Sequence, residues 1–256
     1  MSTGEATTNR PLAGAVALVT GGSGDIGSAI CRRLAQAGAR VVVHYRSSPE
    51  KAQAVLESLP GSGHTVVQAA VEESQDIARM VEHVRAHHGR LDILVNNAGF
   101  TRYVDHGDLE GLDDDLIDRI MQVNFRAAFA CVRAFRRMLE ADEGGVVINI
   151  SSIAGRTGQG SNVAYCASKA AMDSMTRSLG RALAPRIRVV SVAPGLVNGP
   201  YAAGFDPAWV QEQVKRTPLG RLVVAEDVAE TVYGVIVHMP MTTGCYIPVD
   251  GGRPLT

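Results

Sequence analysis

Short apolar runs alternate along the chain with segments whose apolar residues recur at helical spacing. The first run, Gly14–Thr20, precedes Asp25–Ala37, whose apolar residues fall on one helix face. Further strand-like runs are Val41–Tyr45, Thr65–Ala69, Leu91–Val95, Gly145–Ile150, Ile187–Val192 and Cys245–Val249. Helical spacing recurs at Pro49–Leu59, Ser74–His87, Asp113–Leu139, Asn162–Ala184 and Ala225–Val237.

Strands of nearly continuous apolar residues that alternate with helices are typical of a parallel sheet covered on both faces. We therefore predict an α/β fold, a Rossmann-like doubly wound parallel sheet in three αβα layers. Because no linker or internal repeat interrupts the chain, we expect a single domain over residues 12–256 after a flexible leader, residues 1–11. Residues 196–217, rich in glycine and proline, are predicted to form a substrate lid; the alternative is an ordinary surface excursion.

Composition excludes several classes of protein. The 256 residues include 25 basic and 26 acidic side chains, a net charge of −1, which argues against a nucleic-acid or membrane-surface partner. The polar N-terminus lacks the apolar core of a secretory signal, and no uncharged apolar run reaches the ~18 residues that span a bilayer. The cysteines form no C-x-x-C pair, so we expect free, buried thiols in a cytoplasmic protein.

A glycine-rich turn, Thr20–Gly27 with the sequence TGGSGDIG, joins the first strand to the first helix. Glycines let a backbone turn tightly against a pyrophosphate, which the amides of the helix N-terminus then hold. The turn contains G-x-G-x-x-G, and its place after a strand makes it a dinucleotide signal. The candidate cofactor-binding residues here are Gly21, Ser23, Gly24, Asp25, Ile26 and Gly27. Asp25 would repel the phosphates unless it points away or caps the helix.

The second strand ends without the carboxylate that usually binds the ribose 2′-hydroxyl of NAD. It ends instead in Tyr45, Arg46 and Ser47, and the guanidinium with its neighbouring hydroxyl suits a 2′-phosphate. The sequence therefore favours NADP(H) over NAD(H). The alternative is that Arg46 is one of many surface arginines.

Tyr165 and Lys169 stand four residues apart on a predicted helix and so share one face. The chain has only three lysines against 22 arginines, so a chance Y-x-x-x-K pair is rare. An ammonium beside the phenol is expected to lower its pKa toward working pH, which would make Tyr165 an acid or base. Ser152 follows another strand, where its hydroxyl can hydrogen-bond a substrate carbonyl.

These motifs resemble the short-chain dehydrogenase/reductase family, in its single-domain branch, over about Leu12–Gly252. The matching features are the glycine turn, Asn96–Gly99, Asn124, Ser152, Tyr165 with Lys169, and Pro194-Gly195. The segments Pro218–Arg221 and Val249–Gly252 are similar to those of 3-oxoacyl-acyl-carrier-protein reductases.

The resemblance implies roles for individual residues. Tyr165 would be the general acid, Ser152 would orient the carbonyl, and Lys169 would lower the phenol pKa and bind the nicotinamide ribose. Asn124 would hold a water that connects Lys169 to solvent. The remaining cofactor contacts implied by the resemblance are Val71 after the third strand, Asn97, Ala98 and Gly99 on the adenosine-ribose side, and Pro194, Gly195 and Val197 on the nicotinamide side. It also implies a homotetramer that packs Asp113–Leu139 and Asn162–Ala184 across subunits.

The chain departs from the family pattern in the cofactor region. Asp25 replaces a glycine, Ala70 replaces the acidic residue near adenine, and Gly199 replaces a threonine after Pro-Gly. These changes affect the expected cofactor contacts more than the expected reaction, an NADP(H)-dependent reduction of a ketone such as a 3-oxoacyl thioester. Two alternatives are an NAD-dependent dehydrogenase of a sugar, steroid or dihydrodiol, and a non-catalytic NADP(H)-sensing regulator.

Other polar clusters favour structural roles. His83, His87 and His88 end a helix and are expected to form a solvated, cationic helix end, so no metal site is predicted. Asp113–Asp115 precede a helix and are expected to cap it. The candidate specificity positions are Phe100, Arg102, Ile153–Arg156, Asn162 and Tyr201–Trp209, a mixture compatible with many small carbonyl substrates.

Overall fold

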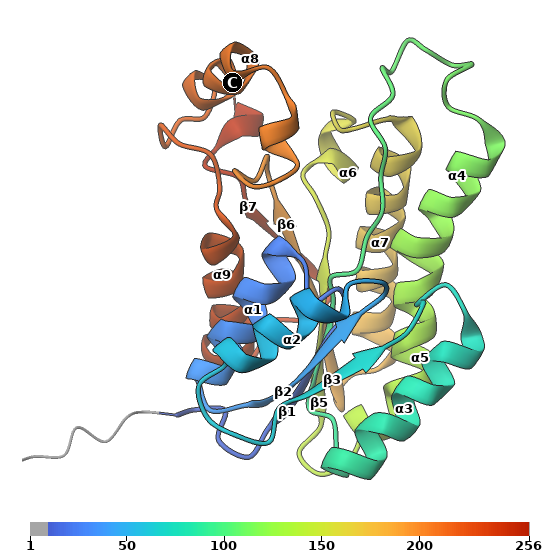
Figure 1. The fold of residues 1–256 in the computed structure, drawn as a ribbon, viewed down its shortest axis with the longest axis vertical. Helices are drawn as coiled ribbons and strands as arrows, with labels where there is room; N and C mark the ends of the chain where they lie inside the picture. Colours follow the sequence, from blue (N-terminus) through green and yellow to red (C-terminus); the bar gives the residue numbers. More distant parts are fainter. Residues whose placement is uncertain (1–9, 256) are drawn as a thin grey trace, which may run out of the picture.

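In the computed structural model, which describes residues 10–255, seven parallel strands form one sheet in the order β3-β2-β1-β4-β5-β6-β7 (Figure 1). The strands are β1 (Val16–Val19), β2 (Arg40–Tyr45), β3 (Thr65–Gln68), β4 (Ile93–Asn96), β5 (Gly145–Ile150), β6 (Ile187–Pro194) and β7 (Cys245–Val249). The order reverses between β1 and β4, which opens a crevice at their carboxyl ends. The predicted doubly wound fold is confirmed. The predicted leader lies outside the described residues except for Arg10 and Pro11.

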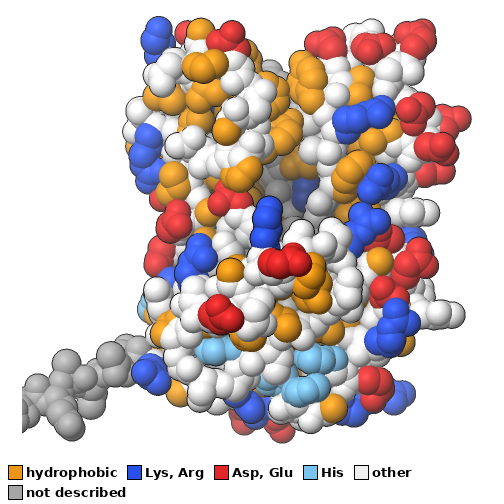
Figure 2. Space-filling view, in the orientation of Figure 1, with side chains coloured by type: hydrophobic (Ala, Val, Ile, Leu, Met, Phe, Trp, Pro, Cys, Tyr) orange, Lys and Arg blue, Asp and Glu red, His pale blue; other side chains and the backbone are white. Residues whose placement is uncertain are grey.

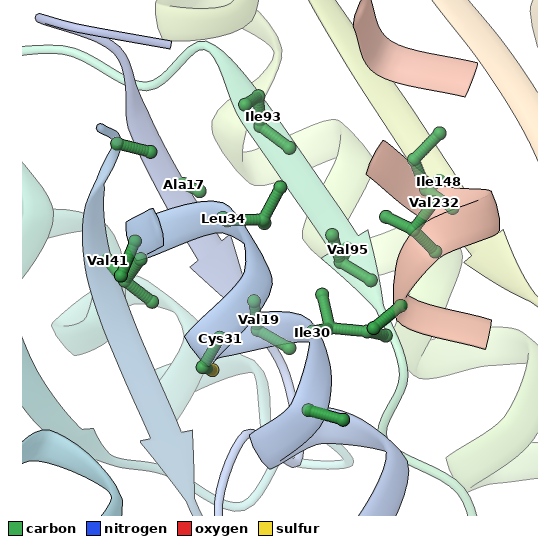
Figure 3. Packing of buried hydrophobic residues seen from close by; sticks show 14 of the residues in the cluster. Ala17, Val19, Ile30, Cys31, Leu34, Val41, Ile93, Val95, Ile148 and Val232 are labelled. Atoms are coloured by element: carbon green, nitrogen blue, oxygen red, sulfur yellow. The ribbon is translucent and has the colours of Figure 1, made fainter. Parts of the chain in front are cut away.

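Helices cover both faces of the sheet (Figure 1). One layer holds α1 (Asp25–Gln36), α2 (Pro49–Ser58) and α9 (Ala225–His238), and the other holds α3 (Ser74–His88), α5 (Ala127–Leu139) and α7 (Val163–Ala182). Side chains of β1 alternate between the two cores, with Val19 on the α1 side and Leu18 on the α5 side. Figure 3 shows Ile30 of α1 close to Val95 of β4 in the first core. Burial on both faces explains why the strands contain so few polar residues.

The predicted helix Asp113–Leu139 is divided by a π-helical turn. It consists of α4 (Asp114–Met121), a π-helix over Gln122–Arg126, and α5. The Asp113 side chain accepts a hydrogen bond from the Leu116 amide at 2.7 Å, which confirms the predicted cap. π-Helical turns occur frequently at functional sites, and this one carries Asn124, whose side chain is fully buried.

The expectation of a solvated histidine cluster is wrong for His88, which is buried against β3. The hydroxyl of Thr65 hydrogen-bonds both His88 and His83, at 3.0 and 3.1 Å. Burial lowers the pKa of His88 to about 4, so its ring is neutral at physiological pH. Among residues 10–255, no group of His, Cys, Asp and Glu side chains is arranged to hold a metal ion.

The cysteines match the prediction of free thiols, because Cys31, Cys131 and Cys166 are buried and Cys245 is half-buried, all unbridged. Burial raises the pKa of Cys31 and Cys131 to about 12, so these thiols stay protonated and unreactive. Within residues 10–255 we find no helix with the length and apolar character needed to cross a membrane.

Four short elements surround the carboxyl end of the sheet. They are α6 (Ala154–Thr157), a 3-10 turn over Ala202–Gly204, α8 (Pro207–Lys215) and a 3-10 turn over Arg253–Leu255. The predicted lid, residues 196–217, therefore contains its own helix, and α8 stands at the top of the molecule in Figure 1. Asp206 caps α8 by accepting a hydrogen bond from the Ala208 amide at 2.7 Å.

Candidate active site

A cavity of about 870 Å³ opens at the carboxyl end of the sheet, and Trp209 and Gln213 of α8 form part of its wall. Figure 2, in the orientation of Figure 1, shows a hollow in the surface between the region around α8 and the region around α4. Three of the four predicted catalytic residues line the cavity: Ser152, Tyr165 and Lys169. Of the predicted cofactor residues, the wall also includes Ile26, Asn97, Gly99, Pro194, Gly195 and Val197. The fold thus joins the start of α1 to the predicted catalytic residues in one space.

The N-terminus of α7 fixes the position of Tyr165. The Asn162 side chain caps the helix by accepting a hydrogen bond from the Tyr165 amide at 2.7 Å. The amide nitrogen of Asn162 donates to the Arg102 carbonyl at 2.7 Å, and the side chain is fully buried. Asn162 was expected to contact substrate, and this expectation is wrong because its polar atoms are used by the cap and the neighbouring loop.

Tyr165 lies half-buried in the cavity wall and hydrogen-bonds the Ser152 hydroxyl. Burial raises the pKa of Tyr165 to about 12, and the hydrogen bond with Ser152 lowers it by less than burial raises it. The expected lowering by Lys169 is not seen, because the ammonium nitrogen lies 5.7 Å from the ring centroid and does not offset desolvation. Tyr165 is therefore protonated at neutral pH and equipped to donate a proton.

Lys169 is buried, and its ammonium donates a hydrogen bond to the Ile150 carbonyl at 2.8 Å. Burial lowers the pKa of Lys169 to about 8, while the negative charge of Asp173 raises it. Asp173 follows one turn later on α7 and is 4% exposed. Neither carboxylate oxygen of Asp173 has a hydrogen-bond partner among the described residues. The charge of Lys169 is thus sensitive to pH near neutrality and depends on Asp173.

Replacing Asp173 by Asn should shift the alkaline limb of the kcat/KM–pH profile for ketone reduction to lower pH, by about half a unit or more. Asp173 favours the protonated ammonium, so its loss lowers the pKa of Lys169 and the lysine becomes neutral at a lower pH. The check is the full pH profile, with Asp118→Asn on the exposed face of α4 as the matched control. A limb that stays in place or moves to higher pH contradicts this role of Asp173.

Asn124 lies behind the cavity wall and joins two segments. Its amide nitrogen donates to the Phe100 carbonyl at 3.0 Å and to the Ser168 hydroxyl at 3.1 Å. Its side-chain oxygen accepts from the Phe100 amide at 2.7 Å. Because both amide hydrogens bind protein acceptors, Asn124 ties the loop after β4 to α7. The water-holding role implied by the resemblance stays a prediction.

The glycine turn is closed by backbone contacts at two positions. Gly21 has a φ angle of +64°, a backbone conformation that residues other than glycine rarely adopt. A Cβ on Gly27 would lie 2.2 Å from the Gly21 carbonyl oxygen. The Asn97 side chain donates to the Thr20 and Gly21 carbonyls at 2.9 and 3.1 Å. Asn97 therefore holds the turn with its side chain, while Ala98 packs against the second core and Gly99 lines the cavity.

His44 in β2 also contacts the glycine turn, and this contact was not predicted from the sequence. Its Nδ1 accepts a hydrogen bond from the Gly21 amide at 2.8 Å, and its Nε2 pairs with the Ala69 carbonyl at 2.9 Å. These partners indicate a neutral ring protonated at Nε2. Burial lowers the pKa of His44 to about 4, which keeps the ring neutral at physiological pH. The available signal was a histidine inside an otherwise apolar strand.

The residues predicted to contact the adenosine part of the cofactor are only partly brought together in the structure. Tyr45 packs half-buried against the first core, and Val71 is 5% exposed within the second. Arg46 and Ser47 are exposed at the end of β2. The Arg46 guanidinium forms an ion pair with Glu72, at 2.8 Å, a partner that sequence reasoning missed.

Asp25 and Gly199, two departures from the family pattern, are neighbours in space. Asp25 does not cap α1, because Gly24 is the N-cap residue and no side chain caps the helix. The Asp25 carboxylate instead points at Gly199, where a Cβ would lie 2.2 Å from its Oδ2. The absence of a side chain at position 199 thus leaves room for the carboxylate.

The residues present fit a nicotinamide dinucleotide. The cavity extends from Ile26 at the start of α1 to Lys169 and Val197, which is the path of such a cofactor across the switch point of the sheet. The glycine turn would hold the pyrophosphate, and the end of β2 would hold the adenosine ribose.

Comparison with known proteins identifies the family. The family model described as short chain dehydrogenase matches residues 15–208. A protein of Streptomyces violaceoruber named as ketoacyl reductase 2 of the granaticin polyketide synthase is 40% identical over 94% of this chain and 96% of its own. The 3-oxoacyl-[acyl-carrier-protein] reductase FabG of Staphylococcus aureus is 33% identical over 92% and 96%.

A solved structure agrees with these relatives. A crystal structure titled as a short-chain dehydrogenase/reductase from Burkholderia xenovorans superposes with a TM-score of 0.86 and 32% identity, over 94% of this chain and 98% of that one. The chain therefore belongs to the short-chain dehydrogenase/reductase family, and it is an oxidoreductase that acts on carbonyl or alcohol groups with a nicotinamide cofactor.

Proposed function

We propose that the protein uses NADPH to reduce the ketone of a 3-oxoacyl thioester to a secondary alcohol. The observation that carries this proposal is the meeting of Ser152, Tyr165 and Lys169 in a cavity that reaches the start of α1. The names of the two relatives, a ketoacyl reductase and a 3-oxoacyl-[acyl-carrier-protein] reductase, support the substrate class.

Each residue contributes one function to the reaction. Ser152 orients the ketone oxygen through its hydroxyl, which already hydrogen-bonds the Tyr165 phenol. Tyr165 donates its proton to that oxygen as negative charge develops on it. Lys169 supplies a positive charge on the same helix face, which stabilises the phenolate left behind. The cofactor, when bound, supplies the hydride that adds to the carbonyl carbon. The products are a secondary alcohol and the oxidised cofactor.

The preference for NADP(H) rests on the end of β2. Arg46 is exposed there, and the strand itself ends without the carboxylate by which an NAD enzyme usually binds the ribose hydroxyls. An NAD-dependent dehydrogenase of a sugar, steroid or dihydrodiol is the second candidate, and the carboxylate of Glu72 beside Arg46 is the observation that favours it. A non-catalytic NADP(H) sensor is disfavoured by the assembled Ser152, Tyr165 and Lys169.

Aromatic side chains from the loop after β4 and from the predicted lid segment line the cavity. Phe205 and Trp209 stack with their ring centroids 4.7 Å apart, and Tyr103 and Tyr201 meet Phe205 edge-on. The predicted lid segment thus supplies aromatic rings to the cavity that also contains Tyr165, and their apolar surfaces suit the acyl part of a ketone substrate.

Two arginines among the candidate specificity positions, Arg102 and Arg156, already have partners within the protein. The Arg102 guanidinium lies 3.5 Å from the Asp113 carboxylate, and that of Arg156 lies 3.7 Å from the centroid of the Tyr246 ring. The aromatic wall is therefore a better-supported substrate contact than either arginine.

One experiment tests the proposed function. NADPH and NADH oxidation should be followed with acetoacetyl thioesters, cyclic ketones and sugars as substrates. We expect turnover of the thioester with NADPH, and Arg46→Ala should raise KM for NADPH about tenfold or more while leaving that for NADH within about twofold. Tight cofactor binding without turnover of any substrate would favour the sensor, and faster turnover of sugars with NADH would favour the second candidate.

We also propose a cytoplasmic homotetramer. The free thiols support the compartment. Phe129 on α5 and Val163 on α7 are 40% and 47% exposed on the helices expected to meet across subunits. Sedimentation velocity measures the assembly directly, and a monomer would refute it.

A further inference from the structure

The Arg46 guanidinium is not an open anion site in the structure. Its Nη2 lies 2.8 Å from Oε1 of Glu72, which belongs to the loop between β3 and α3. The Arg46 side chain is 52% exposed, whereas that of Glu72 is 13% exposed. The carboxylate is thus the anchored member of the pair, and the guanidinium lies on its solvent side.

The backbones of both partners are held by neighbouring side chains. Gln68 donates to the Arg46 carbonyl at 3.0 Å, and the Arg126 guanidinium donates to the Glu72 carbonyl. The second carboxylate oxygen of Glu72, Oε2, is buried and has no hydrogen-bond partner among the described residues. Among the described residues, the carboxylate therefore has its polar contact with Arg46, and losing that partner would leave its charge uncompensated.

We propose that Glu72 sets the strength with which this protein distinguishes NADPH from NADH, by competing with the 2′-phosphate for Arg46. This inference rests on the proposed role of Arg46 as the 2′-phosphate contact. A 2′-phosphate that reaches the guanidinium also comes close to the Glu72 carboxylate, and the like charges repel. A 2′-hydroxyl carries no charge and meets no such repulsion. Glu72 therefore penalises NADPH selectively.

The pair also explains why residue 46 alone does not decide the cofactor. An arginine at the end of β2 favours NADP, whereas a carboxylate beside the ribose favours NAD. This chain places one of each in contact, from the segments that follow two neighbouring strands, β2 and β3. The preference for NADPH is the difference between the two effects, and Glu72 makes it smaller.

Calorimetric titration of the purified full chain with 2′,5′-ADP and with 5′-AMP isolates the 2′-phosphate without turnover. Glu72→Gln should tighten binding of 2′,5′-ADP about tenfold and leave binding of 5′-AMP within about twofold. Glu73→Gln removes the same charge from the adjacent, exposed residue and is the matched control, with no expected change in either affinity. The ratio of kcat/KM for NADPH to that for NADH should rise by about the same factor in Glu72→Gln.

Glu72→Met supplies a second variant, because it removes the charge without leaving a polar atom at the buried Oε2 position. Unchanged or weaker binding of 2′,5′-ADP in both folded Glu72 variants overturns the proposal; weaker binding would show that Glu72 orients Arg46. Arg46→Gln separates this failure from that of the proposed function. If Arg46→Gln leaves 2′,5′-ADP affinity unchanged, the proposed NADPH preference itself is wrong.

Discussion

Tyr165→Phe should lower kcat/KM for ketone reduction about a thousandfold and leave NADPH affinity within a few fold. The substitution removes one oxygen, the atom that hydrogen-bonds Ser152 and would protonate the substrate. The ring itself remains, so the packing of the cavity wall is kept. Because the pKa of Tyr165 is raised to about 12, the phenol is the protonated donor at neutral pH.

Two measurements separate loss of chemistry from loss of binding. Single-turnover NADPH oxidation reports the chemical step, and fluorescence titration of bound NADPH reports affinity. Tyr233→Phe on α9 is the matched control, since that ring packs against Arg33 and is not one of the residues that line the cavity. Loss of activity with equal loss of NADPH affinity would assign Tyr165 a binding role, and near-normal turnover would remove it from the mechanism.

The alternation of strands and helices could be predicted because burial on both faces leaves a direct trace in the sequence. Val16–Val19 and Val41–Val43 are fully buried, and a strand in that position consists mainly of apolar residues. The helices α1 and α7 keep their apolar spacing because one face of each packs on the sheet. Helix and strand bounds differ from expectation by a few residues at most, where backbone pairing rather than side-chain pattern decides the end.

The candidate site was predictable where its residues are close in sequence. Tyr165 and Lys169 share a helix face, and Ser152 follows β5, so periodicity and topology together bring them to one place. The π-helical turn at Asn124 was not predicted, and the partners of the Asn124 side chain, Phe100 and Ser168, come from two other segments. Local sequence carries no record of such partners.

Contacts between distant segments account for the other differences. His44 accepts a hydrogen bond from Gly21, which lies 23 residues earlier in the sequence. Glu72 pairs with Arg46 because the two residues follow β3 and β2, which are neighbours in the sheet. Asp25 and Gly199 were two unexplained departures in the sequence, and the structure shows them in contact. His88 was expected in solvent because helix ends usually are exposed, yet β3 runs beside this one and buries the ring. Each case depends on which segments the fold makes neighbours.

Gly27→Ala should destabilise the protein by about 3 kcal/mol and abolish measurable NADPH binding at concentrations that saturate the native protein. Helix propensity alone predicts the opposite sign, because alanine inside a helix is favoured over glycine by about 1 kcal/mol. The close packing of α1 against the glycine turn reverses the sign of this effect on stability. A Cβ at position 27 would lie 2.2 Å from the Gly21 carbonyl oxygen and 2.8 Å from the Asn97 amide nitrogen. The first of these is backbone, so α1 must move away from the turn that would hold the pyrophosphate.

Two other glycine-to-alanine substitutions provide matched controls, one in the same turn and one in α9. A Cβ on Gly24, in the same turn, meets the Gly21 carbonyl oxygen at 3.3 Å, so Gly24→Ala should lose less than about 1 kcal/mol. Gly234 lies within α9 with nothing within 4 Å of a Cβ, and Gly234→Ala should gain about 0.5–1 kcal/mol. Urea unfolding of the three variants at one protein concentration gives the order of stability. If Gly27→Ala unfolds at or above the urea concentration of the native protein, the turn does not need the close approach of α1, and the pyrophosphate site proposed at Gly21–Gly27 loses its structural basis.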